Sequence, residues 1–224
     1  MLIALLAGCT GGSVAVDNNR YALGFDGVGC ATAYLDAQAQ TNAITIEATV
    51  QGDADATFAS YPVLHWSDRL LLAGLDDGRT WFGSPDTSSG GVIDVAGFMD
   101  GKSHHLAGTW DEDGRIQLFV DGLRIGFADL NSGAGAGDTL EIGCWNTDQD
   151  WSFQGLIDEV RISSTVRYTT NFDEELPETF EVDADTTALW HFDEGEGTDF
   201  LDNTGSYDGT LVNVEWVPFD AWGE

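Results

Sequence analysis

Hydrophobic and polar residues alternate with a period of two along most of the chain. The segment AITIEATV, residues 43–50, places isoleucine, alanine or valine at every second position and threonine or glutamate between them. This alternation predicts a β-strand with one buried face. Similar runs recur along the chain, at residues 69–75, 90–98, 115–122, 123–130, 139–145 and 155–162.

Turn signals separate these runs. Asp-Gly pairs occur at residues 77–78, 113–114 and 121–122, and they suit tight hairpins because both residue types accept a positive φ at low cost. Residues 104–130 therefore read as three strands joined by two hairpins. Short strands at this spacing, in a chain too long for an immunoglobulin-type domain, predict a large antiparallel sandwich or barrel.

Composition is compatible with a folded core and narrows the possible partners. The 224 residues are 42% hydrophobic and 11% aromatic, which suffices for one domain. Thirty-nine acidic residues against eight basic ones give a formal charge of −31. This charge excludes nucleic-acid binding through phosphate neutralisation and disfavours anionic membranes. Two explanations stay open, a solvated acidic surface and binding of multivalent cations.

The first nine residues, MLIALLAGC, form an apolar run that ends in Leu6-Ala7-Gly8-Cys9. This ending resembles the lipobox of bacterial lipoproteins, in which the cysteine carries the lipid. It predicts lipidation of Cys9 and an exported lipoprotein at the outer membrane or cell surface of a bacterium, with the lipid as its only membrane contact. The run is shorter than a normal signal peptide and no Lys or Arg precedes it, so the start of a buried strand or helix is the alternative.

Two further cysteines, Cys30 and Cys144, remain if Cys9 carries a lipid. In an oxidising compartment such a pair predicts one disulfide. Two small buried thiols are the alternative.

The order of several segments resembles the laminin-G-like, concanavalin-A-like jelly-roll domains. These segments are YALGFDGVG, ITIEATV, the stretch from His104 to Gly126, LEIGCW, GLIDEVRIS and ALWHFDEGEG. The resemblance spans residues 20 to 216 and implies a sandwich of two curved antiparallel sheets with one structural calcium. We accordingly predict a signal segment and tether at residues 1–19, a single jelly-roll domain at residues 20–217 and a tail at residues 218–224.

One segment stands in an unusual place. In many relatives the segment that corresponds to residues 189–216 precedes the FDG strand, whereas here it follows. A sandwich whose termini lie close together accepts such a permutation. We therefore expect residues 189–216 to fill the same slot in the fold, with residues 171–187 as an acidic loop leading into it.

The resemblance points to Asp26 and Asp158 as calcium ligands. Calcium takes six to eight oxygen ligands, which acidic loops on the rim of a sandwich supply. Each residue also has a simpler explanation. Asp26 precedes a glycine and suits a turn, while Asp158 lies in an apolar run and could pair with Arg161 or Arg167 instead.

The family binds glycans or proteins more often than it catalyses reactions, and exposed indoles would be the natural glycan platform. Most of the eight tryptophans are expected in the core. Trp145 and Trp151 flank the polar stretch NTDQD and are the predicted ligand contacts. We predict an exported binding module for carbohydrate or for matrix and cell-surface ligands, with a structural or protein-adhesion role as the alternative.

A glycoside hydrolase on the same fold is the second alternative. Retaining enzymes of this type place two glutamates around an aspartate on one strand. The nearest candidate, QGLIDEVRI, has Leu156 where the first glutamate would stand, and alternation would turn Asp158 and Glu159 to opposite faces. No other catalytic motif is present, so we predict that the chain is not an enzyme.

The adjacent histidines, His104 and His105, invite a catalytic or metal-binding interpretation. On a strand, however, neighbouring side chains leave opposite faces of the sheet, so the two cannot share one metal. We predict a scaffold strand with one histidine packed and the other nearer to solvent.

Overall fold

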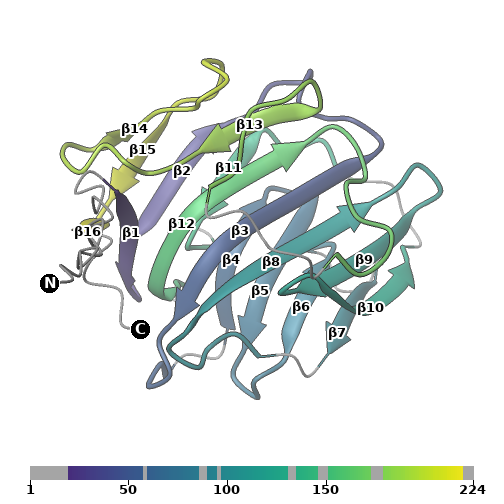
Figure 1. Ribbon diagram of the computed structural model, residues 1–224, viewed down its shortest axis with the longest axis horizontal. Coiled ribbons are helices and arrows are strands. Elements are labelled where there is room, and N and C mark those ends of the chain that lie inside the picture. Colours follow the sequence, from purple (N-terminus) through teal and green to yellow (C-terminus); the bar gives the residue numbers. More distant parts are fainter. Residues whose placement is uncertain are drawn as a thin grey trace, which may run out of the picture.

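The computed structural model describes residues 20–57, 60–85, 90–94, 97–130, 135–145, 151–172 and 179–218. These residues form two antiparallel sheets packed face to face, and none of them lies in a helix (Figure 1). The prediction of an all-β jelly-roll sandwich is confirmed. Within the same ranges there is no helix of the length and apolar character needed to cross a membrane.

Sheet A has eight strands in the order β10-β9-β8-β3-β12-β1-β16, with β13 paired to the other end of β12. The strands are β1 (Tyr21–Asp26), β3 (Ile44–Gly52), β8 (Ser103–Trp110), β9 (Arg115–Val120), β10 (Leu123–Asp129), β12 (Gln154–Ser163), β13 (Thr186–Trp190) and β16 (Glu215–Pro218).

Sheet B also has eight strands, in the order β14-β15-β2-β11-β4-β5-β6-β7. They are β2 (Cys30–Tyr34), β4 (Ser60–Trp66), β5 (Leu70–Leu75), β6 (Thr80–Gly83), β7 (Gly91–Asp94), β11 (Thr139–Ile142), β14 (Asp199–Phe200) and β15 (Gly209–Val212).

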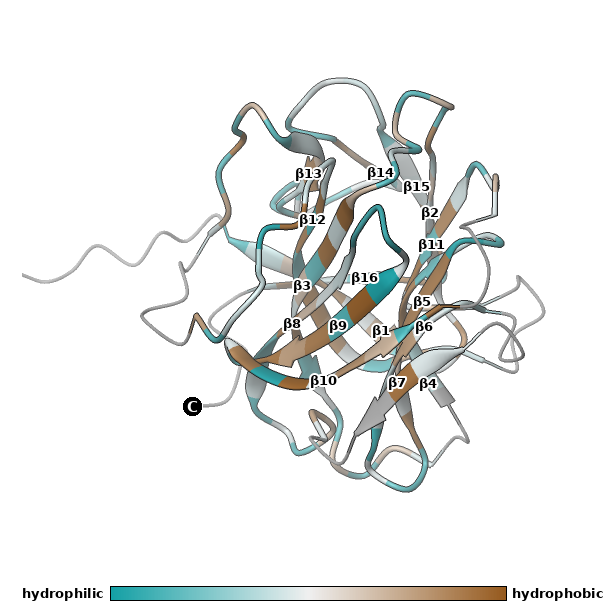
Figure 2. Ribbon diagram, turned by 90° about the vertical axis from the view of Figure 1, so that its right-hand side faces the viewer, coloured by the Kyte–Doolittle hydropathy of each residue, from teal (hydrophilic) through white to brown (hydrophobic). Residues whose placement is uncertain are grey.

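The core lies between the sheets, where every second residue of the central strands is buried. Ile44, Ile46, Ala48 and Val50 of β3 all join it, as the period-two pattern predicts. Hydrophobic residues follow the strands and hydrophilic residues gather in the connections (Figure 2). Trp66, Trp110 and Trp190 are buried in this core, in line with the expectation for most of the indoles.

The hairpins β8-β9 and β9-β10 form where the Asp-Gly pairs predict them. Asp121 and Gly122 both have a positive φ, 50° and 74°, which a two-residue hairpin turn with the right twist requires. Aspartate adopts a positive φ more readily than most residues other than glycine, because its short polar side chain can form local hydrogen bonds.

The segment after β13 completes both sheets. Strand β15 pairs with β2 and strand β16 pairs with β1, while Phe192 and Phe200 are fully buried in the core. Residues 186–218 thus occupy a slot beside the first two strands, as the permuted order predicts. The exact domain boundaries stay a prediction, because the described residues begin at 20 and end at 218.

A strap, residues 164–172 and 179–185, crosses the outer face of sheet A, the face turned away from sheet B. The rings of Tyr168 and Phe172 stack with centroids 3.6 Å apart. Both rings contact Phe119, which projects from β9 on this face. Tyr168 Oη donates a hydrogen bond to the buried carboxylate of Glu47, 2.7 Å away. The strap therefore covers the part of the outer face of sheet A around Phe119 and Glu47.

Candidate functional site

Trp145 and Trp151 lie together where the chain passes from β11 to β12. Trp145 N donates a hydrogen bond to Trp151 O, at 2.8 Å. The two indole rings meet edge to face, with centroids 5.3 Å apart and an angle of 66° between them. The structure thus brings the two predicted ligand contacts into one pair, while the NTDQD residues 146–150 lie outside the described residues.

Trp145 rests on a histidine–glutamate pair on the outer face of sheet B. The rings of Trp145 and His65 have centroids 5.0 Å apart, and His65 Nδ1 lies 2.7 Å from Glu141 Oε2. Both His65 and Glu141 are buried, and Trp81 packs nearby, whereas Trp151 is 45% exposed. Trp145 is thus packed against buried side chains, and Trp151 beside it is exposed. The exposed indole presents a flat apolar face next to polar groups, which suits stacking with a sugar ring.

The predicted disulfide between Cys30 and Cys144 is confirmed, so the alternative of two free buried thiols is wrong. It joins the start of β2 to the residue before Trp145. Ser152 Oγ also donates a hydrogen bond to Gly29 O, at 2.8 Å. The tryptophan pair is therefore tied on both sides to the turn between β1 and β2.

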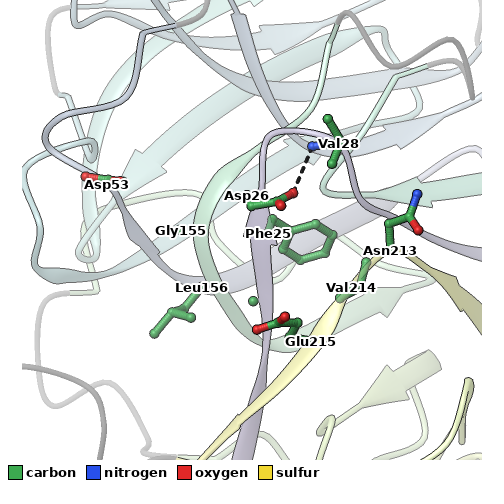
Figure 3. A pocket seen from close by; sticks show the side chains of 10 residues that line it. Phe25, Asp26, Val28, Asp53, Gly155, Leu156, Asn213, Val214 and Glu215 are labelled. Carbon is green, nitrogen blue, oxygen red and sulfur yellow. Dashed lines mark hydrogen bonds between the residues drawn. The ribbon is translucent and has the colours of Figure 1, made fainter.

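A pocket of about 590 Å³ lies beside that turn and is lined by residues of the turn and of β1, β12 and β16. This volume is within the usual range for ligand pockets. Figure 3 shows Asp26 beside Phe25 on β1 and Glu215 on the neighbouring β16. The pocket combines apolar walls with carboxylates and an amide, and its lining consists of Gly24, Phe25, Asp26, Val28, Asp53, Gly155, Leu156, Asn213, Val214 and Glu215.

Asp26, one of the two predicted calcium ligands, lines this pocket and shapes the turn. Its Oδ1 accepts a hydrogen bond from Val28 N, at 3.2 Å (Figure 3). This contact is the turn-forming role that aspartate commonly takes before glycine. The structure thus supports the simpler explanation of Asp26 as a turn residue. Only Oδ1 takes part in the hydrogen bond with Val28 N.

Asp158, the second predicted ligand, lies in a β-bulge of β12. Ile157 pairs with Val50 and Val160 pairs with Ala48, so β12 has one more residue than β3 over this interval. Ile157 and Val160 both point into the core. Asp158 and Glu159 therefore both lie on the outer face, and the expectation that they point to opposite faces is wrong because the bulge breaks the alternation.

The surroundings of Asp158 are buried and crowded with charge. Arg20 Nη2 lies 3.1 Å from Asp158 Oδ2, so Arg20 takes the pairing role that the sequence offered to Arg161 or Arg167. The pKa of Asp158 is raised to about 8, chiefly because the carboxyl group is buried. The negative charges of Glu159 and Asp193 raise this pKa further, whereas the positive charge of Arg20 lowers it. The carboxyl group is thus poorly stabilised as an anion.

Asp26 and Asp158 do not converge on one ion. Asp26 pairs with Gln154 across β1 and β12, four positions before Asp158. At ~3.3 Å per residue this places the two on the order of 13 Å apart, beyond the reach of a shared ligand shell. The two aspartates therefore belong to separate parts of the outer face.

The residues around Asp158 offer few ligands to a hard cation. Asp158 Oδ1 is buried and has no hydrogen-bond partner within the described ranges, and Asp193 lies near enough for its charge to act on Asp158. Carboxylate oxygens are the ligands that calcium prefers. Among the described residues, however, Asp158 belongs to no group of three or more side chains close enough to hold a metal ion together, whereas calcium takes six to eight oxygen ligands. Calcium itself stays a prediction.

The adjacent histidines have separate structural partners. His105 is buried on the outer face of sheet A, where its Nε2 lies 3.0 Å from Glu47 Oε2. His104 is nearer to solvent, with Nδ1 2.8 Å from Asp121 Oδ2 and Nε2 3.0 Å from Asp100 Oδ1. The prediction of a scaffold strand with one packed histidine is confirmed.

Several residues of these sites escaped sequence reasoning. Glu141 stands at an outward position of an alternating run, and this was a usable signal, but its partner His65 lies 76 residues away. Arg20 and Glu215 carry no motif at all. Cross-strand partners depend on strand order, which the pattern of one strand does not contain.

Two antiparallel sheets packed face to face, with the exposed Trp151 beside one outer face, define a two-sheet β-sandwich. The family model of the concanavalin A-like lectin/glucanases superfamily matches residues 16–170. The chain therefore belongs to this superfamily. No curated protein matches the chain.

Solved structures share the fold at low sequence identity. A candidate carbohydrate-binding protein from Bacteroides ovatus is 17% identical with a TM-score of 0.73, over 90% of this chain and 60% of that one. A heptameric SAP-like pentraxin from Limulus polyphemus is 12% identical with a TM-score of 0.56, over 89% of this chain and 98% of that one. This chain thus spans less than two thirds of the Bacteroides protein.

Proposed function

We propose that the chain is a carbohydrate-binding module whose ligand stacks on Trp151. The observation that carries this proposal is the exposed Trp151 indole, 45% exposed, packed edge to face on Trp145. Membership of a lectin-type superfamily and the fold shared with the Bacteroides ovatus protein support it. An indole held ready in its binding position loses little conformational entropy when a ligand arrives.

A glycan array tests this function. The full chain, carrying Cys9→Ser so that no lipid can be attached, is compared with the same chain carrying Trp151→Ala. We expect the first protein to retain a defined set of glycans and the second to lose them. A blank array for the first protein contradicts the proposal and transfers the role to protein ligands.

The pocket at Asp26 is proposed as a second contact for the same ligand. Asp26 and Glu215 carboxylates and the Asn213 amide could accept hydrogen bonds from sugar hydroxyl groups, beside the apolar Phe25 and Leu156. The β1–β2 turn supplies Asp26 and Val28 to the pocket, and its Gly29 accepts a hydrogen bond from Ser152, the residue after Trp151. Glu215→Gln is expected to weaken glycan binding several-fold without changing the melting temperature.

We propose binding rather than catalysis. Asp158 and Glu159 share a face, but both are 1% exposed. Both oxygens of Glu159 also accept hydrogen bonds, from His191 and from Phe180 N. Carboxyl groups that cannot reach a substrate do not support glycoside hydrolysis. Release of reducing sugar from any glycan that the array retains would contradict this part of the proposal.

A protein-adhesion role is the second candidate, and one surface favours it. Phe127 on β10 is 58% exposed, and the guanidinium groups of Arg115 and Arg124 lie 4.8 and 5.8 Å from its ring centroid. Aromatic and arginine side chains are enriched at protein interfaces. Loss of binding to a cell-surface protein on Phe127→Ala, with glycan binding intact, would support this role.

We further propose that the chain is exported and anchored by a lipid on Cys9, as an outer-membrane or cell-surface lipoprotein of a bacterium. Cys9 lies outside the described residues. The Cys30–Cys144 disulfide supports an oxidising compartment. Mass spectrometry of the N-terminal peptide is expected to show acylated Cys9, and an unmodified peptide in the membrane fraction would contradict the anchor.

A further inference from the structure

The outer face of sheet B carries a buried group of three side chains that can each ligate a metal. Cys30 on β2, Glu141 on β11 and Cys144 just after β11 each offer one ligand atom, and these atoms lie within 4.8 Å of one another. The three residues are 8%, 7% and 3% exposed. Within the described ranges, no other set of three His, Cys, Asp or Glu side chains gathers this closely.

Backbone pairing holds the three residues together independently of the disulfide. Strands β2 and β11 are paired, with Thr32 opposite Glu141. Cys30 lies two residues before Thr32, so its side chain leaves the same face of the sheet as Glu141. Cys144 is held by a bridge to Ser152. Reduction of the disulfide therefore leaves the two thiol groups and the carboxylate side by side.

Two polar neighbours contact the group from outside. His65 Nδ1 lies 2.7 Å from Glu141 Oε2, and Thr32 Oγ1 lies 3.7 Å from Cys30 Sγ. Hydrogen bonds of this kind orient the ligands of metal sites and raise their affinity. The ring of Trp145 packs on His65, with centroids 5.0 Å apart. The group thus has both the burial and the supporting contacts of a structural metal site.

The ligand types select zinc rather than calcium. Calcium takes oxygen ligands alone, whereas zinc binds cysteine sulfur and carboxylate oxygen in a tetrahedral arrangement. At Zn–S distances of about 2.3 Å, two sulfurs in a tetrahedron lie roughly 3.8 Å apart. This spacing falls within the 4.8 Å that encloses the three ligand atoms. A water molecule would complete the fourth position.

We propose that the reduced chain binds one zinc ion through Cys30, Cys144 and Glu141, so that the disulfide and the metal are alternative cross-links at one place. A dithiol passes two electrons to the disulfide and becomes a disulfide itself, which leaves Cys30 and Cys144 as thiols. Zinc then replaces the two thiol protons, which pass to the solvent. The inference concerns the reduced chain and does not depend on glycan binding.

Metal titration of the full chain with Cys9→Ser tests the proposal. The protein is compared oxidised and after reduction by a dithiol that is then removed under nitrogen. Zinc affinity is measured by competition with a coloured chelator, and cobalt is used as a second probe because thiolate ligation gives it a charge-transfer absorption band. A melting curve of each protein without metal shows that it is folded.

Three variants identify the ligands. Cys30→Ser with Cys144→Ser removes both sulfurs, while Glu141→Gln removes the carboxylate and keeps both cysteines. Glu196→Gln is the matched control, because Glu196 is exposed and belongs to no such group.

We expect the reduced parent chain and Glu196→Gln to bind one zinc ion per chain and to show the cobalt band. The oxidised parent and the double serine variant should bind no zinc, and reduced Glu141→Gln should bind it at least tenfold more weakly. No zinc binding by the reduced parent, equal binding by the oxidised chain, binding that survives loss of both sulfurs, or parent affinity in Glu141→Gln would each overturn the proposal.

Discussion

His104 lies between two aspartates, and this position makes its charge part of the fold's stability. The hydrogen bond with Asp121 raises the pKa of His104; partial burial opposes the rise, and Asp100 adds to it. A histidine whose folded pKa lies above its unfolded value stabilises the folded state fully at pH values below the unfolded pKa. That contribution is lost as the pH rises through the folded pKa.

The variant His104→Gln should therefore lose stability at pH 5.5 and lose much less at pH 8.5. We expect a difference of about 1 kcal/mol between the two pH values, the usual net contribution of one hydrogen bond. Urea unfolding of both proteins at each pH measures it. A destabilisation that does not change with pH would show that the charge of His104 contributes nothing.

Single residues show where sequence reasoning succeeds and where it fails. The disulfide followed from the number of cysteines and the expected compartment, and the strand histidines followed from alternation. Asp158 was placed on the wrong face relative to Glu159 because one extra residue in β12 changes the alternation. Nothing in GLIDEVRIS marks a bulge, since its position is set by pairing with β3.

Glu47 joins several elements on the outer face of sheet A. It lies on β3, is fully buried, and contacts His105 of β8 and Arg161 of β12 at 3.0 and 2.8 Å. Burial alone would raise the pKa of Glu47, but the contacts with His105 and Arg161 outweigh it and lower the pKa. Tyr168 adds a hydrogen bond from the strap. The alternating pattern of β3 predicted that Glu47 points outward. It did not predict that the strap buries Glu47, because the strap has no periodic pattern of hydrophobic residues.

Two substitutions separate the strap contact from the buried ion pairs. Tyr168→Phe removes one hydrogen bond, so we expect a loss of about 1 kcal/mol. Glu47→Leu leaves Arg161 and His105 without their buried partner, so we expect a loss of about 3–5 kcal/mol. Chemical denaturation measures both. A loss for Glu47→Leu no larger than that for Tyr168→Phe would contradict the role of Glu47 as the common partner.

The molecule as a whole depends on the closing strands, which follow the rest of the domain in sequence yet lie beside its first strands. That residues 189–216 fill this slot could be predicted from the resemblance and the permuted order, whereas the pairing of β16 with β1 and of β15 with β2 comes from the structure. The side-chain partners within the candidate sites could not be predicted, because these sites form where strands that are distant in sequence lie side by side. Arg20 and Asp158, for example, are 138 residues apart.

Neighbouring residues in this closing segment provide a matched test. Phe200 is fully buried and Leu201 is 56% exposed. Phe200→Ala is expected to lower the free energy of unfolding by about 3–5 kcal/mol, as in other cores, and Leu201→Ala to change it by less than about 0.5 kcal/mol. Similar small effects at both positions would mean that the closing segment does not dock into the core in solution.

Ligand binding by Trp151 is the central claim, and calorimetric titration tests it most directly. The glycan that the array retains best is titrated into the parent chain, Trp151→Ala and Phe127→Ala, the last being an exposed aromatic on the other sheet. The account predicts that Trp151→Ala weakens binding at least tenfold and that Phe127→Ala leaves it unchanged. Unchanged binding by Trp151→Ala, or an equal loss in both variants, would contradict it.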